Sequence, residues 1–216
     1  ALFIIHTGSG AEVTSDTNDI WSHAWSTYNQ PNVDGVIVSS YSMEPEYYTT
    51  TSPCDMIVGV FAHEMGHSVF GLPDMYDYGY DSYGLGKWSL MAAGSWGGGG
   101  SLPAHPDAWC MYQMGFLNPI NVTSNMTTTI YPVEDTAICY RLWKTGLSGA
   151  QYFLVTLRIQ KGYDGSLPGS GILIYHVDEN MSDNDSQWIE NVDAAGALHY
   201  RCALEQADGA FDLSLI

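Results

Sequence analysis

The chain of 216 residues is 45% hydrophobic, enough to bury a core, and it carries 24 Asp and Glu against 6 Lys and Arg, for a formal net charge of -18. Such an acidic surface repels phosphate backbones and anionic membranes, which argues against nucleic acid as a partner. No apolar run approaches the roughly 20 residues of a membrane-spanning helix, so we expect no membrane span.

The first forty residues predict a strand, a helix and a second strand. Apolar and β-branched runs at 2–6 and 35–40 are typical of short strands, and TNDIWSHAWSTYN, residues 17–29, has near-helical apolar spacing after a capping Thr17. The N-terminus lacks the basic-then-apolar layout of a signal peptide, and ALFIIHTG is typical of a buried strand. We therefore expect the chain to begin inside a domain.

The segment FAHEMGHSVFGLPDMYD, residues 61–77, belongs to the next predicted helix. From Asp55 to Phe70, apolar residues recur at intervals of three and four, and Gly71, with Pro73 just beyond, is a helix-stop signal. The spacing predicts a helix over residues 55–70.

Two histidines in this helix are candidate metal ligands. His63 and His67 stand four residues apart, so both side chains lie on one face and can reach one ion, and Glu64 flanks the same site. A zinc ion held by three protein ligands keeps an open position for water and needs a carboxylate nearby to take a proton from that water. The pattern supplies two ligands and the carboxylate. On these five residues alone, ordinary surface or core histidines are the alternative.

The third ligand must come from another segment. Gly71 allows the chain to turn sharply back, which brings Asp74 within reach of the histidines. His105, in LPAHPDAW, follows a glycine-rich stretch and is the reserve candidate. Both candidates stay open.

Residues 79–100 are rich in Gly, Tyr and Ser and predict an ordered but irregular region, followed by a short helix over 107–114. Within it, KWSLMAAGSW places Met91 in a tight turn of small residues, where core filling is the plain interpretation. Asp77 and Asp81 stand on a glycine-rich turn, which makes a calcium site one hypothesis and a solvated acidic loop the other.

After Pro119 the pattern changes to alternating strands. These are predicted over residues 127–133, 137–143, 151–159, 171–177 and 199–206. The chain therefore reads as an α+β protein with its long helix in the first part, residues 1–118, and a β-rich second part, residues 119–216.

The cysteines are even in number and form no CxxC pair, which argues against a cysteine metal site or redox motif and makes two disulfides possible, with three ways to pair them. They are Cys54, Cys110, Cys139 and Cys202. Asn-x-Ser/Thr sequons beginning at residues 121, 125, 180 and 184 add weak support for an extracellular setting.

Four segments, HEMGHSVFGLPDMYD, GKWSLMAAGSW, AHPDAWCMYQMGFLNP and LPGSGILIYHVDEN, together resemble the immune inhibitor A family of secreted zinc metalloproteases, in the zincin class and close to the metzincins. The resemblance implies a zinc endopeptidase with His63 and His67 as ligands, Glu64 as general base and acid, and Met91 in the hydrophobic Met-turn beneath the metal. It also implies secretion, an upstream pro-segment that makes the protein a zymogen, and structural calcium.

One spacing differs from that family. Metzincins have two residues between the second histidine and the glycine, whereas Ser68, Val69 and Phe70 stand there in this chain. An added residue rotates Gly71 by about 100° on an ideal helix. Either the helix extends by that residue or a bulge absorbs it, and the outcome decides whether Asp74 can reach the metal.

The resemblance implies a zincin-like catalytic core over residues 1–118, with a mixed sheet, the active-site helix and the Met-turn, and we expect a β-rich subdomain over 119–216 packed on it. The expected substrates are proteins or peptides. Tyr76, Tyr83 and His176 are candidate donors to the oxyanion, with a structural role as the alternative for His176.

Two other functions remain open at this point. One is a non-catalytic extracellular module that a metal stabilises, and the other is a zinc amidase or esterase on the same scaffold. Glu64 favours an enzyme over a binding module, because a binding module has no need of a base. Peptidase and amidase differ only in the substrate that they accept.

Overall fold

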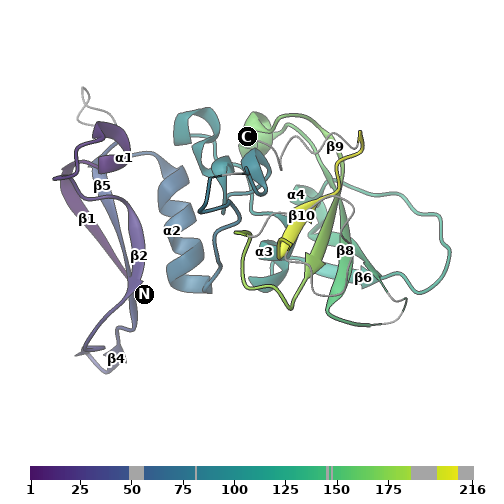
Figure 1. The fold of residues 1–216 in the computed structure, drawn as a ribbon, viewed down its shortest axis with the longest axis horizontal. Helices are drawn as coiled ribbons and strands as arrows, with labels where there is room; N and C mark the ends of the chain where they lie inside the picture. Colours follow the sequence, from purple (N-terminus) through teal and green to yellow (C-terminus); the bar gives the residue numbers. More distant parts are fainter. Residues whose placement is uncertain (49–55, 81, 145, 147, 186–198, 209–216) are drawn as a thin grey trace.

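The computed structural model describes residues 1–48, 56–80, 82–144, 146, 148–185 and 199–208. A three-stranded sheet stands at one end of the molecule, helix α2 lies beside it, and a five-stranded sheet with short helices forms the other end (Figure 1). The chain is thus a mixed α+β protein. No helix in the described ranges has the length and apolar character to cross a membrane.

The three-stranded sheet has the order β1-β5-β2 and is built from Leu2–Ser9, Ser40–Tyr47 and His23–Ser26, respectively. The central strand β5 pairs in parallel with β1 and antiparallel with β2. A short helix α1, Ala11–Thr14, follows β1, and strands β3, Asn32–Val33, and β4, Val36–Ile37, form a separate hairpin. Asp34 and Gly35 turn this hairpin with positive φ angles of 54° and 83°.

The helix expected over residues 17–29 is wrong. The side chain of Asp16 accepts a hydrogen bond from the backbone N–H of Asn18 at 2.9 Å, so a turn forms where that helix was expected to begin. Residues 23–26 then pair with β5 as strand β2. Backbone pairing with a neighbouring strand has overridden the local apolar spacing.

Strand β1 forms as expected, but its burial differs from the prediction. The side chains of Leu2, Phe3 and Ile5 are exposed. Helix α2 packs against β5 and β2, whereas β1 lies at the edge of the sheet. The apolar run at residues 2–6 therefore indicates that the segment forms a strand, but it does not indicate that the strand is buried.

Helix α2, Val58–Phe70, is the central element, and two glycines on it allow close packing. A Cβ atom at Gly59 would lie 1.9 Å from the carbonyl oxygen of Ser95, and one at Gly66 would lie 2.4 Å from the sulfur of Met91. The helix ends at Gly71, which has the left-handed conformation at φ 66°. Met91 is fully buried beneath the helix.

The segment between α2 and the second sheet is irregular, as predicted. It contains two 3-10 segments, η1, Gly86–Trp88, and η2, Ala93–Gly100, before the short helix α3, Ala108–Gln113. The Asp107 carboxylate caps α3 by accepting a hydrogen bond from the N–H of Cys110 at 3.0 Å.

The five-stranded sheet has the order β10-β9-β8-β7-β6. Its strands are β6, Asn118–Asn121, β7, Ile138–Trp143, β8, Gln151–Arg158, β9, Gly171–Asp178, and β10, Cys202–Leu204. Helix α4, Val133–Thr136, precedes β7, and η3, Gly162–Ser166, joins β8 to β9. The strand expected over 127–133 is wrong, since only an isolated bridge from Pro132 to Leu157 forms there.

The expected pair of disulfides is also wrong. Cys110, Cys139 and Cys202 are free thiols, each fully buried in the core formed by α3 and the five-stranded sheet. Cys54 lies outside the described residues. Two disulfides need all four cysteines, and here three of them fill apolar space as small hydrophobic side chains.

Arg158 at the end of β8 connects the second sheet to the middle segment. Its fully buried guanidinium donates two hydrogen bonds of 2.6 Å to Asp164 and lies 3.2 Å from Glu134. The same group reaches the backbone carbonyls of Trp88, His105 and Pro106. These carbonyls flank the turn that contains Met91, so the ion pairs fix that turn relative to the sheet.

Replacing this arginine should destabilise the fold strongly. Arg158→Met would leave two buried carboxylates without their cation, and we expect the free energy of unfolding to fall by about 3–5 kcal/mol. Lys161→Met is the matched control, because it removes an ion pair with Asp135 in which both side chains are largely exposed. Denaturant unfolding at pH 7 measures both variants. If the two substitutions lowered the free energy of unfolding equally, the buried ion pairs of Arg158 would not have this stabilising role.

Candidate metal centre

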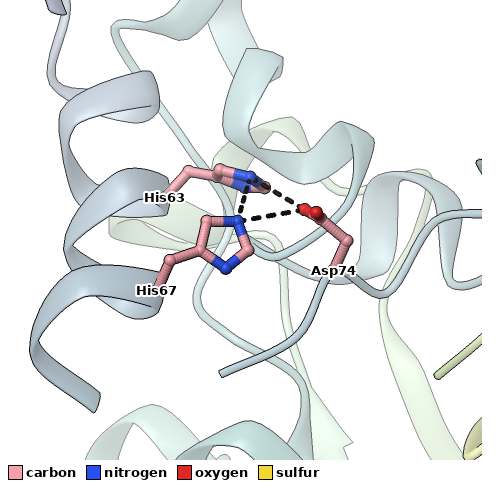
Figure 2. Close-up of side chains that lie close together, drawn as sticks. All are labelled: His63, His67 and Asp74. Carbon is pink, nitrogen blue, oxygen red and sulfur yellow. Dashed lines mark hydrogen bonds and ion pairs between the residues drawn. The ribbon is translucent and has the colours of Figure 1, made fainter. Parts of the chain in front are cut away.

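Two histidines on α2 converge on one point. The Nε2 atoms of His63 and His67 lie 3.0 Å apart (Figure 2). Each ring is oriented by its other nitrogen, because Nδ1 of His63 lies 2.9 Å from the carbonyl oxygen of Leu90 and Nδ1 of His67 lies 2.7 Å from that of Leu72. Since a carbonyl can only accept, both Nδ1 atoms carry the hydrogen. In the neutral rings the lone pairs on Nε2 therefore face the shared point.

Asp74 completes this group from the segment after the helix. Its Oδ1 lies 3.0 Å from Nε2 of His63 and 3.2 Å from Nε2 of His67. Helix α2 continues through Phe70 before Gly71 turns the chain, so the helix itself accommodates the added residue and no bulge is needed. The left-handed glycine then directs the chain back across the end of the helix, which brings Asp74 to the histidines.

The three atoms fit a bound metal ion. Two bonds of about 2.0–2.1 Å at a tetrahedral angle place ligand atoms ~3.3 Å apart, close to the separations seen here. Three lone-pair atoms this close repel one another unless a cation lies between them. Oδ1 of Asp74 is also buried without a hydrogen-bond donor. The donor set therefore has the geometry and the electrostatics of a metal site.

The pKa values of these groups reflect the same need for positive charge. Burial alone would raise the pKa of Asp74, but His63 and His67, which donate hydrogen bonds to its carboxylate only when they carry a second proton, outweigh it and hold that pKa well below its usual range. Burial would lower the pKa of His67, but the hydrogen bond to Asp74 raises it above the ordinary value. A shared proton thus stabilises the cluster in the same way that a metal ion would.

Glu64 stands beside the cluster as a carboxylate with no assigned ligand role. It is only 6% exposed, and burial raises its pKa above the ordinary value, although the two histidines partly offset this effect. A carboxylate of raised pKa accepts a proton near neutral pH more readily than a solvated one.

The cluster and Glu64 open into a cleft of about 650 Å³ between the three-stranded sheet and the loops after α2. Its walls are rich in aromatic side chains, which form a rigid and largely apolar surface. The aromatic lining comprises Trp21, Trp25, Tyr76, Tyr78, Tyr80, Tyr83 and Trp96.

Two of the three candidate oxyanion donors lie in this cleft. The ring of Tyr76 stacks on His63 with centroids 6.4 Å apart, and Tyr83 lines the wall with half of its side chain exposed. His176 does not line the cleft. It lies in β9 with its ring stacked on Phe153 at 5.0 Å, which agrees with the structural alternative.

His105, the reserve candidate for a ligand, and Met91 take other positions. Nδ1 of His105 lies 3.1 Å from the carboxylate of Asp164, away from the histidine pair. Met91 is fully buried directly beneath Gly66 of α2, and its neighbour Leu90 supplies the carbonyl that holds His63. The turn thus supports the helix and orients one ligand.

The calcium hypothesis stays a prediction. Asp77 is buried, and its carboxylate accepts hydrogen bonds from the N–H of Gly79 at 2.7 Å and from the hydroxyl of Ser82 at 3.1 Å. Asp81 lies outside the described residues. Among those that are described, His63, His67 and Asp74 form the one group of His, Cys, Asp and Glu with metal-binding spacing.

Residues from the second half of the chain hold the loop that carries Asp74, and no sequence motif pointed to them. Asn184 is fully buried and donates to the carbonyl oxygen of Met75 at 3.2 Å, while the Asp185 carboxylate accepts from the N–H of Tyr78 at 3.0 Å. More than a hundred positions separate these partners, so no local pattern could indicate them. Asn184 begins a sequon, but its burial leaves no room for a glycan in the folded chain.

Comparison with known proteins gives similarity to one family. Residues 1–118 match the model of the family described as immune inhibitor A peptidase M6, catalytic domain. The chain is 36% identical over 114 residues to the protein named Immune inhibitor A of Bacillus thuringiensis subsp. alesti, covering 45% of this chain and 15% of that protein. It is 34% identical over 122 residues to the Pre-pro-metalloprotease PrtV of Vibrio cholerae serotype O1, covering 50% and 13%. The chain thus matches a small part of these longer relatives.

The metal centre can be tested by its effect on stability. Adding Zn²⁺ to the metal-free protein at a hundred times its dissociation constant should raise the free energy of unfolding by about 2.7 kcal/mol. His67→Gln should lose most of this increase, because it removes one of the three converging atoms. His105→Gln should keep it. Thermal unfolding with and without Zn²⁺ measures both, and an unchanged increase in His67→Gln would exclude this site.

Proposed function

We propose that this chain, which belongs to the immune inhibitor A peptidase M6 family, forms the catalytic part of a zinc-dependent endopeptidase that hydrolyses peptide bonds of proteins. The observation that carries the proposal is the convergence of His63, His67 and Asp74 beside a buried Glu64 in an open cleft. A family match and a local donor set thus support the same chemistry.

The donor set favours zinc as the metal. Two imidazole nitrogens and one carboxylate oxygen are typical of catalytic zinc sites, which use three protein ligands and keep one position open. Calcium and magnesium prefer sites made of oxygen ligands. When bound, zinc would supply Lewis acidity for the peptide carbonyl and lower the pKa of water.

The residues of the chain would perform the proton transfers. The carboxylate of Glu64 takes a proton from the attacking water and then delivers it to the nitrogen of the leaving amine. Its raised pKa suits both steps, because the group must accept and return a proton near neutral pH. The hydroxyl groups of Tyr76 and Tyr83 are the candidates for donating a hydrogen bond to the oxyanion.

The cleft suits an extended peptide. It passes the metal cluster between strand β2 and the loops after α2, so a substrate could lie along it on both sides of the bond to be cut. The aromatic side chains of its walls offer apolar contact without great loss of conformational entropy. A small amide or ester would leave most of this surface unused, and this favours a peptidase over an amidase or esterase.

A non-catalytic binding module remains the alternative from a different class. It would keep the metal but would not need Glu64 buried at the cluster, where taking a carboxylate out of water costs free energy. That cost is readily explained if the carboxylate works as a base. A module without activity should tolerate substitution of Glu64.

Several wider properties belong to the same proposal. We extend to this chain a zincin-like core over 1–118 with a β-rich part over 119–216, secretion, structural calcium, and synthesis as a zymogen with an upstream pro-segment. The name of the Vibrio cholerae relative includes the term pre-pro, which supports the last of these by similarity.

Glu64→Gln tests the proposed reaction. The amide keeps the size of the side chain but cannot accept the proton, so we expect casein cleavage to fall at least ~100-fold while the metal content stays the same. Glu205→Gln is the control, because Glu205 follows β10 and does not line the cleft. Cleavage of fluorescent casein and metal analysis of the same samples measure the result. Full activity in Glu64→Gln would exclude this mechanism.

A further inference from the structure

We propose that Tyr78 is a positioning residue for the metal centre, whose hydroxyl group fixes the carboxylate of Asp74 so that Oδ1 faces both histidines. The inference rests on the proposed metal site and assigns a role to a tyrosine that the sequence analysis did not select. It concerns how tightly the chain binds zinc rather than the cleavage step itself.

The two oxygens of Asp74 have different partners. Oδ1 faces the Nε2 atoms of His63 and His67 and has no other donor, whereas Oδ2 accepts a hydrogen bond from the hydroxyl of Tyr78. The terminal torsion of an aspartate is broad, so its carboxylate rotates easily unless a partner selects one orientation. The Tyr78 hydroxyl selects one orientation, because it donates to Oδ2 and leaves Oδ1 directed at the two histidines.

Tyr78 is itself held in place. Its backbone N–H donates to the Asp185 carboxylate at 3.0 Å, and its ring packs edge-on against Tyr76 with centroids 5.2 Å apart. Tyr76 in turn stacks on His63. The phenol therefore meets Asp74 from a defined direction, as a group that orients a ligand must.

The hydroxyl group also compensates a charge. Asp74 is 7% exposed, so water reaches its carboxylate poorly, and a hydrogen bond to Oδ2 stabilises the ionised form that binds a metal. Removing the bond would take a hydrogen-bond donor away from a buried oxygen. Outer hydrogen-bond partners of metal ligands typically change metal affinity by about 10–100-fold when they are lost.

Tyr78→Phe isolates this hydroxyl group, because the ring and its packing remain. We expect the zinc dissociation constant, measured by competition with a chromophoric chelator at fixed pH, to rise by about 10–100-fold. The matched control is Tyr80→Phe, which removes the hydroxyl of a tyrosine in the same cleft that is 74% exposed. This control should keep the zinc affinity of the unchanged protein.

Two further readouts separate positioning from other roles. The visible absorption of the Co²⁺-loaded protein should change in Tyr78→Phe and not in Tyr80→Phe, because it reports the arrangement of the ligands. In Tyr78→Phe, kcat/KM for a peptide should rise as zinc is added up to saturation, because added metal fills the weakened site. Thermal unfolding of the zinc-free proteins checks that both variants fold alike.

A zinc dissociation constant in Tyr78→Phe within two-fold of the unchanged protein would overturn the inference, as would an equal loss in Tyr80→Phe. A large fall in kcat/KM at saturating zinc with unchanged zinc affinity would also overturn it, because it would place Tyr78 in the reaction. Failure of the proposed function would look different. The unchanged protein would bind zinc and cleave no peptide, and the comparison of zinc affinities would still stand.

Discussion

The structure depends on one electrostatic constraint, the convergence of three lone-pair atoms within about 3 Å of one another. Nε2 of His63, Nε2 of His67 and Oδ1 of Asp74 repel each other without a cation between them. The carbonyls of Leu90 and Leu72 hold the imidazole rings in this orientation. Packing and hydrogen bonds therefore hold the three atoms in an arrangement that is favourable only when a proton or a metal ion lies between them.

Elements distant in sequence maintain this arrangement. The buried ion pairs of Arg158 attach the five-stranded sheet to the segment around Met91. The side chain of Met91 lies against Gly66 of α2, the helix that carries both histidines. On the other side, Asn184 and Asp185 hold the loop after the helix. Arg158 and Met91 thus support helix α2, whereas Asn184 and Asp185 restrain the loop that contains Asp74.

Residues outside the range that matches the family also contact the loop beside the metal centre. The match covers residues 1–118 and includes every proposed metal ligand and Glu64. Asn184 and Asp185 lie beyond it, yet they contact the loop between Asp74 and Tyr78. The second part of the chain thus contributes to the site through backbone contacts, and a segment ending at residue 118 would lack them.

The sequence by itself indicated the candidate residues on the helix and the elements with strong local signals. His63, Glu64 and His67 follow from helical spacing, the end of α2 at Phe70 follows from Gly71, and three strands of the second sheet lie close to their predicted ranges. These features depend on neighbours within a few residues, which a local pattern records.

Only the tertiary structure decided the rest. Local spacing indicated a helix over 17–29, but pairing with β5 made part of it a strand. An even count of cysteines suggested disulfides, but packing buried three of them as free thiols. The placement of Asp74, and not of His105, beside the two histidines depends on a helix that absorbs one more residue and on Asp164, which lies beside His105. Each of these outcomes is set by contacts between segments far apart in the chain, and local periodicity carries no information about them.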